Sequence, residues 1–368
     1  LYEYARGGYD NGSGLSKRIL PETELYNLAD YRLRYASYRS DPNLQALHAA
    51  FPMIANTDDH EGANDAWEGG AENHQPDEGD WTNRKNAAMQ VWREWMPVSE
   101  QPWKSYDIGD LATYFRTDTR MVARSRPASY GTILRSGDPA AALSAFRDGV
   151  WQDPAATMLG TEQENWLYHG FRAASRQKKT WHVLGVGTNI GYNSTPPDAL
   201  DWLDPKADVR ANAYFRAGIA AGKAGLPYNL DNWGGYPQAK SRLLRAAQAT
   251  DANLVAVTGD SHNAWAFDLI DGDREVGVEF GGHSVTSPGI ESATRAEDKE
   301  KVAKALVANS KELRWTDTSN RGYMHVSLTP AAATCEWIFM DTVKMVSTAT
   351  KAGHRMKVRP GRKMLESA

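Results

Sequence analysis

Two short clusters of acidic and histidine residues suggest chemistry in this sequence, and the first is Asp58-Asp59-His60-Glu61. It follows an apolar run at residues 51–54, which is typical of a short strand or of the approach to one. Neighbouring carboxylates repel one another unless a cation holds them together, and hard oxygen ligands beside a histidine suit a bound metal ion. The alternative is a solvated acidic turn that caps a helix, and these residues alone leave it open.

The second cluster is Gly259-Asp260-Ser261-His262, and it follows the strongest strand pattern in the chain, at residues 253–257. In α/β sheets, ligands bind beyond the carboxyl ends of the strands. Asp260 and His262 are two residues apart, so an extended backbone would point both to the same side. Two acid-and-histidine clusters, each after an apolar run, together favour a metal site. Their oxygen-rich ligands favour a hard cation such as calcium, ferric iron or manganese over structural zinc.

Other reactive residues fit a site less well. His182 lies inside a predicted strand and is typical of a satisfied core histidine, whereas His283, in a glycine-rich turn, could reach the site. Ser261 and Ser287 could be hydrolase nucleophiles, but neither lies in a Gly-x-Ser-x-Gly elbow. The sequence therefore favours metal chemistry over a serine nucleophile.

The elements that must position these clusters alternate along the first two thirds of the chain. Helical periodicity and start signals predict helices at residues 21–38, from 41 onward, and at 83–95, 158–167, 238–250 and 298–310. Apolar and β-branched runs predict strands at residues 110–115, 180–186, 253–257, 275–280, 322–328 and 334–340. Thr161 and Glu164 fit a capping box at the start of the helix at 158–167.

The remaining segments are predicted to be less regular. Residues 1–20 are expected to form a loop, and residues 191–235 a long irregular or partly helical insertion. Asp118-Thr119-Arg120 follows a predicted strand, and an arginine beside an acid there predicts a structural ion pair or, alternatively, a phosphate clamp. No linker divides the chain sharply. We expect one domain over residues 1–368, a mixed sheet covered by helices, and a peripheral basic tail at residues 345–368.

Composition excludes several classes of function. The chain has 368 residues, 41% of them hydrophobic, so it can bury a large core. A net charge of -4 provides no basic footprint for nucleic acid or an anionic membrane, and no apolar window of about 18 residues is present to span a bilayer. The single cysteine, Cys335, excludes an internal disulfide. Thirteen tryptophans and sixteen tyrosines predict core or crevice walls, with a sugar-stacking surface as the alternative.

Short motifs recur along the chain in an order typical of one family. They are Leu1-Tyr2-Glu3-Tyr4, residues 31–42, Asp58-Asp59-His60-Glu61 with Asn64, Asp118-Thr119-Arg120, residues 159–163 and 166–167, residues 181–185, Trp233-Gly234-Gly235-Tyr236, residues 258–265, Ser287-Pro288-Gly289 and residues 321–324. With these motifs the chain resembles, nearly from end to end, the PhoD-like alkaline phosphatases, a branch of the calcineurin-like metallophosphoesterases.

The resemblance implies a four-layer α/β/β/α sandwich with mixed sheets and a site for two metal ions, typically Fe3+ and Ca2+. Carried over by position, Asp59 resembles the acid that bridges or binds the second metal, and Asp260 and His262 resemble late ligands to both. Tyr2 resembles a phenolate ligand to ferric iron. Asn64 resembles a further ligand on the calcium side.

The resemblance also implies a reaction, the hydrolysis of phosphate monoesters or diesters as in alkaline phosphatases. A metal-bridged hydroxide would attack phosphorus while His60 protonates the leaving oxygen, and Asp58 and Glu61 would support the ligands. One alternative is a phosphodiesterase or phospholipase-type hydrolase on the same site, and another is a non-catalytic binding protein on a truncated scaffold. Expected partners are small-molecule, lipid or nucleotide phosphoesters, without specific nucleic-acid binding.

Some features depart from the family pattern. Leu1 is not a methionine, so we expect upstream sequence that includes the family's Gly-Asp before Tyr2 and an earlier acid or cysteine ligand. Thr57 stands where relatives have tryptophan or another apolar residue, and residues 185–189 replace the usual glutamine-rich segment, which predicts a different substrate preference. The resemblance implies a periplasmic or secreted location, and the sequence carries no signal for an oligomeric state.

Overall fold

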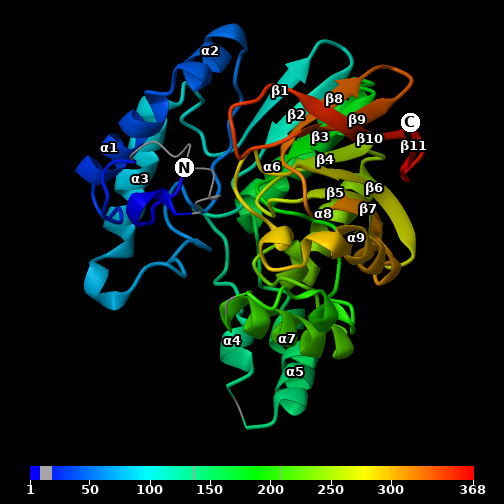
Figure 1. Cartoon of the computed structure of the whole chain (residues 1–368). Coiled ribbons are helices and arrows are strands. Elements are labelled where there is room, and N and C mark those ends of the chain that lie inside the picture. The colour runs from blue at the N-terminus through cyan, green and yellow to red at the C-terminus, as the bar shows by residue number, and fades with distance from the viewer. Residues whose placement is uncertain (9–18, 136, 208) are drawn as a thin grey trace.

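The computed structural model describes residues 1–8, 19–135, 137–207 and 209–368, and its centre is a seven-stranded sheet (Figure 1). The strand order is β1-β2-β3-β4-β6-β5-β7. These strands are β1 (Lys104–Ile108), β2 (Ala112–Arg116), β3 (Trp181–Gly185), β4 (Leu254–Thr258), β5 (Ala264–Asp271), β6 (Arg274–Gly281) and β7 (Leu313–Asp317). β2, β3, β4 and β6 are parallel, so their carboxyl ends meet at one edge of the sheet, whereas the other pairings are antiparallel.

A second sheet packs face to face against the first. It has the order β11-β10-β9-β8, with strands β8 (Gly322–Leu328), β9 (Ala333–Met340), β10 (Thr350–Val358) and β11 (Glu366–Ser367). Every second side chain of β9, such as Cys335 and Trp337, is buried against Val255 and Phe280 of the first sheet. This period of two is the pattern of a strand with one face in a core.

Helices cover the opposite face of the larger sheet. The helices of the described chain are α1 (Leu28–Arg39), α2 (Pro42–Ala50), α3 (Trp81–Trp95), α4 (Tyr130–Ile133), α5 (Pro139–Asp148), α6 (Gly160–Arg176), α7 (Val209–Lys223), α8 (Pro237–Ala249) and α9 (Lys299–Ala308). Leu167 of α6, Leu243 of α8 and Val302 of α9 share one apolar cluster with the sheet. The predicted α/β fold with two sheets packed as a sandwich is confirmed, but only the larger sheet is mixed, because every pairing in the smaller sheet is antiparallel.

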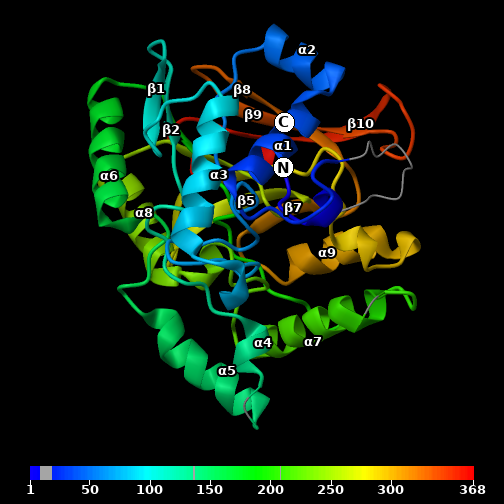
Figure 2. The ribbon, with the colours of Figure 1, turned by 90° about the vertical axis from the view of Figure 1, so that its left-hand side faces the viewer.

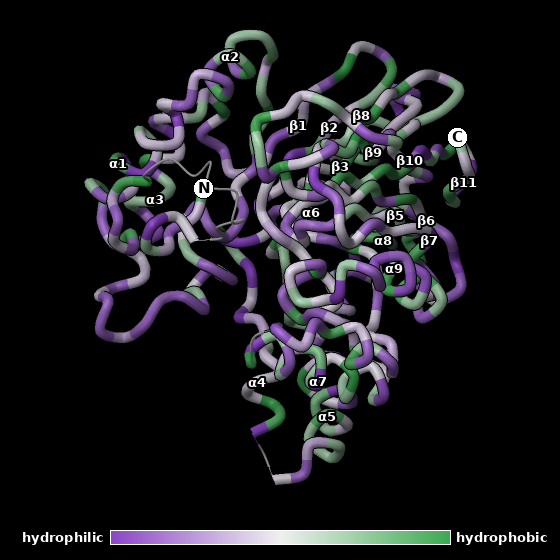
Figure 3. The backbone as a smooth tube through the Cα atoms, viewed as in Figure 1, coloured by the Kyte–Doolittle hydropathy of each residue, from purple (hydrophilic) through white to green (hydrophobic). Residues whose placement is uncertain are grey.

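Two further helical groups flank the sheets, as Figures 1 and 2 show. α1 and α3 pack together through Tyr31, Tyr35 and Val91, and form a layer beside the sheets with α2. α4, α5 and α7 form a lobe at the other end, with Leu143 and Leu226 in its small apolar core. Figure 3 colours the chain by residue hydropathy. It shows many hydrophobic residues along the strands and more hydrophilic residues in the loops.

Two predicted helix starts are wrong for a local reason. The first helix begins at Leu28 instead of residue 21, because the Asn27 side chain accepts the N–H groups of Ala29 and Asp30 while the Asp30 carboxylate accepts that of Asn27. At α6, the predicted cap Thr161 lies inside the helix. Thr157 lies just before this helix. Its hydroxyl accepts a hydrogen bond from the Gly160 N–H and donates one to Glu164.

Most other predicted elements are confirmed. The six predicted strands correspond to β2, β3, β4, β6, β8 and β9, and the helices from 41 onward and at 83–95, 238–250 and 298–310 to α2, α3, α8 and α9. The predicted peripheral tail is wrong for part of residues 345–368, because β10 pairs with β9 and buries Met356 and Val358. In the loop predicted at residues 1–20, Ala5–Gly7 form a 3-10 helix, and residues 9–18 lie outside the described part. Among the described residues, no helix is both long and apolar enough to cross a membrane.

Candidate metal and phosphate site

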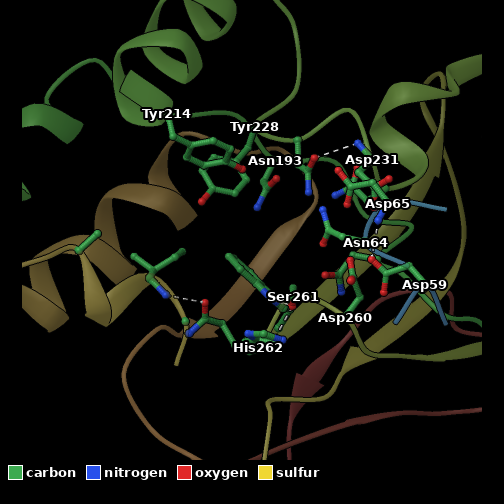
Figure 4. A pocket seen from close by; sticks show the side chains of 18 of the residues that line it. Asp59, Asn64, Asp65, Asn193, Tyr214, Tyr228, Asp231, Asp260, Ser261 and His262 are labelled. Carbon is green, nitrogen blue, oxygen red and sulfur yellow. Dashed lines mark hydrogen bonds between the residues drawn. The ribbon is translucent and has the colours of Figure 1, made fainter. Parts of the chain in front are cut away.

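The second cluster lies in the loop after β4, and its backbone is not extended. Asp260 has a φ of 69° and His262 a φ of 60°, so the prediction that an extended backbone aligns their side chains is wrong. Side-chain-bearing residues seldom adopt this left-handed conformation, and it persists where the surrounding structure holds it. The turn still directs both side chains into one cavity (Figure 4).

The first cluster lies in an irregular segment that passes close to the loop after β3. The apolar run at 51–54 before it forms no strand, and Phe51 is exposed, so the strand expected there is wrong. A turn follows instead, closed by the Gly62 N–H, which donates to the Asp59 carbonyl over 2.8 Å. Gly187, just after β3, permits a close approach, because a Cβ there would lie 3.0 Å from Asp58 Oδ1.

Three carboxylates from the two clusters meet in this region. Asp58, Asp59 and Asp260 each place an oxygen within 4.8 Å of the others. Burial raises the pKa of Asp58 to about 6, and burial followed by repulsion from Asp58 raises the pKa of Asp260 well above its usual value. Close, largely buried and mutually repelling oxygens are a donor set that fits a hard cation, and of the three only Asp59 is fully buried. Sequence reasoning gave Asp58 only a supporting role, and the geometry adds it to the candidate ligands.

Arg120 connects these acids through one buried guanidinium. Its Nε donates to Asp58 Oδ1 over 2.9 Å and its Nη1 to Asp231 Oδ2 over 2.5 Å, and its Nη2 lies 3.3 Å from Asp260 Oδ1. The predicted ion pair with Asp118 is wrong, because Asp118 Oδ1 accepts backbone N–H groups, among them that of Arg120 itself. The arginine therefore makes ion pairs, but with acids distant in the sequence.

The other predicted site residues lie around the same region. The Tyr2 hydroxyl lies 3.2 Å from His262 Nε2, and its ring is 4.5 Å from that of His60. Asn64 lines the cavity with Asp59, His60, Asp260 and His262, while its side-chain amide donates to Glu72. The cavity has a volume of about 590 Å³.

Comparison with known proteins identifies the family. The family model of PhoD-like phosphatases matches residues 1–337 of this chain. The chain belongs to the PhoD-like phosphatase family. It is 29% identical over 350 residues to alkaline phosphatase D of Bacillus subtilis (strain 168). This alignment covers 90% of this chain and 51% of that protein. A solved structure titled "Structure of PhoD" superposes with a TM-score of 0.71 at 24% identity, over 100% of this chain and 64% of that chain, and supports the fold. This chain thus spans about half the length of its curated relative.

In this PhoD-like chain, His60 is held in its protonated form by acids. Its Nδ1 lies 2.6 Å from Glu3 Oε2, and its backbone N–H donates to Asp59 Oδ1 over 2.9 Å. Burial alone would lower the pKa of His60, but the Asp59 carboxylate and the hydrogen bond to Glu3 outweigh it and raise the pKa to about 9. The carboxylates of Asp58, Asp59 and Asp260 are called the acid group from here on. A protonated imidazole beside the acid group can give a proton to a leaving oxygen.

Glu3 is a site residue that sequence reasoning missed. Its side chain is fully buried, and Oε1 accepts hydrogen bonds from the Asn64 backbone N–H and from Asn73. The only sequence signal for Glu3 was its place in the motif Leu1-Tyr2-Glu3-Tyr4, and this motif indicates no function for Glu3. Glu3 thus orients His60 and the turn that carries Asn64.

Further acids were also missed, and one expected histidine lies elsewhere. Asp65 and Asp231 line the cavity, and burial, followed by the nearby Asp231 and Asp59 carboxylates, raises the pKa of Asp65 to about 8. His283 does not line the cavity, since its ring packs on Phe339 of the second sheet. His182 is the buried core residue that was expected, and its Nε2 hydrogen-bonds with Ser175, but it is not fully satisfied, because its Nδ1 has no hydrogen-bond partner among the described residues.

The Glu3 contact predicts a measurable pKa. Glu3→Gln should lower the pKa of His60 from about 9 toward 6.5, because the substitution removes one of the charges that stabilise the imidazolium. A pH titration of the His60 ring by NMR measures this. In the wild type, the raised pKa contributes stability fully below about pH 6.5, and this contribution is lost as pH rises through about 9. Glu72→Gln is the control, and an equal shift in both variants would contradict the assignment.

The Arg120 contacts predict a large stability change. Arg120→Gln should lower the free energy of unfolding by about 3–5 kcal/mol, because it leaves buried carboxylates without their cation. Denaturant unfolding followed by tryptophan fluorescence measures the loss. Arg32→Gln is the matched control, because Arg32 pairs with Glu94 at the exposed surface, where solvent screens the pair and its loss should change stability little. Equal losses in the two variants would rule out a central role for Arg120.

Proposed function

We propose that this chain hydrolyses phosphate esters at the site where Asp58, Asp59 and Asp260 converge beside His60. The observation that carries the proposal is this convergence of three carboxylate oxygens within 4.8 Å, next to a histidine whose pKa is raised to about 9. The family name and that of the curated relative, alkaline phosphatase D, support the same reaction class. Phosphomonoesters and phosphodiesters are both candidate substrates.

The residues divide into those that would hold cations and those that would move protons. Carboxylates and the Asn64 amide suit Ca2+, whereas the Tyr2 phenol and the His262 imidazole, 3.2 Å apart, suit Fe3+. When bound, the metal ions supply positive charge that polarises the phosphoryl oxygens and lowers the pKa of an attacking water.

His60 performs the proton transfer in this proposal. His60 lines the cavity and its Nδ1 contacts Glu3, and we assign to its other ring nitrogen, Nε2, the proton that passes to the departing alkoxide. Asp59 holds the backbone of His60 and so keeps the proton donor next to the acid group. Arg120 keeps Asp58 and Asp260 oriented toward each other.

Two variants test the proposal. His60→Ala should lower kcat by roughly 10²–10⁴-fold, as expected for the loss of a general acid, and Asp260→Asn should lower both turnover and metal content. The assays use 4-nitrophenyl phosphate and bis(4-nitrophenyl) phosphate, which distinguish monoesterase from diesterase activity, together with metal analysis of the purified protein. His169→Ala and Asp273→Asn are the controls, because both positions are exposed and do not line the cavity.

The outcomes separate this proposal from its alternatives. Activity only on the diester would favour a phosphodiesterase or phospholipase-type hydrolase at the same site. A protein that holds fewer than two metal ions and hydrolyses neither ester would favour a non-catalytic binding protein. Unchanged turnover in both His60→Ala and Asp260→Asn would contradict the site assignment. A periplasmic or secreted location is proposed on the family resemblance alone.

A further inference from the structure

The cavity has a second wall, opposite the acid group, that the proposed hydrolysis does not use. Figure 4 shows Asn193, Tyr214 and Tyr228 on this wall, facing the cavity across from Asp260 and His262. Tyr214 belongs to α7, and the three residues come from the insertion at 191–235. A phosphate group bound at the acid group would leave most of the cavity, about 590 Å³, to the remainder of the ester.

Asn193 presents an unused amide to this space. It is only 6% exposed, yet among the described residues its side-chain amide has no hydrogen-bond partner. Asn193 lines the cavity and its amide is not one of the buried side-chain groups closed off from solvent, so the amide is accessible to a ligand that supplies a donor and an acceptor. The backbone of Asn193 is fixed, because its carbonyl accepts the Tyr228 N–H over 2.8 Å.

Two tyrosine rings stand beside this amide. The rings of Tyr214 and Tyr228 meet edge to face, with centroids 5.4 Å apart and planes at 86°. Tyr214 remains 43% exposed, so ring surface is available to a ligand. The segment that carries Tyr228 is anchored, because the Tyr130 hydroxyl donates to the Pro227 carbonyl over 2.6 Å. The wall is therefore formed before any ligand arrives.

A cation lies on the same side of the cavity. Arg210, one helical turn before Tyr214 on α7, lines the cavity and is exposed. No ion pair of Arg210 is found among the described residues. A guanidinium in this position suits a second anionic group of a ligand.

We propose that Asn193, Tyr214 and Tyr228 recognise the nucleobase of a nucleoside phosphate whose phosphate binds at the acid group. This inference rests on the proposed function and names its substrate class. A base provides a flat π face for a tyrosine ring, and a purine such as adenine offers an adjacent donor and acceptor that a side-chain amide can bind in pairs. A phosphate ester of a simple polyol could hydrogen-bond with the Asn193 amide, but it has no flat π face to stack on the exposed Tyr214 ring.

The experiment compares ligands that differ only in the base. Adenosine 5′-monophosphate and ribose 5-phosphate are titrated into the metal-loaded protein by calorimetry, and their kcat/KM values are measured. The wild type should prefer the nucleotide by about tenfold or more, as expected for the stacking of one base on an aromatic ring. Tyr214→Ala and Asn193→Ala should each reduce this preference by about tenfold. They should do so by weakening the binding and turnover of the nucleotide, while the values for ribose 5-phosphate stay the same. Tyr214→Phe keeps the ring and should keep the preference.

The controls separate failure of this inference from failure of the proposed function. Tyr323→Ala removes a tyrosine of similar exposure, 52%, from the second sheet and should change neither ligand. Equal binding of the two ligands to the wild type, or an unchanged preference in Tyr214→Ala, overturns the inference even if both esters are hydrolysed. Preferential binding of the nucleotide that depends on Tyr214 supports it even without turnover, and the missing turnover would then count against the proposed function alone.

Discussion

The candidate site depends on one buried guanidinium. Arg120 pairs with Asp58 in the segment before the first turn, with Asp260 after β4 and with Asp231 in the insertion at 191–235. These three segments are far apart in the sequence, and their carboxylates would repel one another strongly in a poorly screened interior. The relative placement of both clusters that suggested chemistry in the sequence therefore depends on a residue that neither cluster contains.

Even with Arg120, the region has more negative than positive groups. Six carboxyl groups lie close to two guanidiniums and one imidazole here. They are Glu3, Asp58, Asp59, Asp65, Asp231 and Asp260, with Arg120, Arg124 and His60. A buried site short of positive charge either retains protons, as the raised pKa of Asp65 indicates, or takes up a cation. Cation binding here should therefore release protons. This imbalance separates the site from a solvated acidic turn, in which water would screen the same charges.

The sequence predicted what is local and missed what is distant. The apolar run of β4 predicted a buried strand, and the rule for strand ends drew attention to Asp260 and His262, which line the cavity beyond that strand. Glu3 could not be found this way, because it reaches His60 across 57 residues through a contact that only the fold creates. The left-handed φ of Asp260 and His262 has no signal in residue types that normally avoid it. The start of α1 differs for another reason: Pro21 followed by acids is typical of a helix start, whereas the helix begins only after the capping box of Asn27 and Asp30.

The insertion at 191–235 shows how the charge network and the shape of the cavity depend on the same contacts. The sequence predicted this segment only as irregular or partly helical. In the structure it supplies Asp231 to Arg120 and Arg124, and also Tyr214 and Tyr228 to the far wall. Arg124 fixes the carboxyl-terminal end of the insertion, because its guanidinium also donates to the Tyr236 hydroxyl and to the Asp231 backbone carbonyl. Asp231 is buried, whereas Tyr214 is 43% exposed. Substitutions on the exposed side of α7 can therefore change what the cavity recognises while the contacts that fix the acid group stay intact.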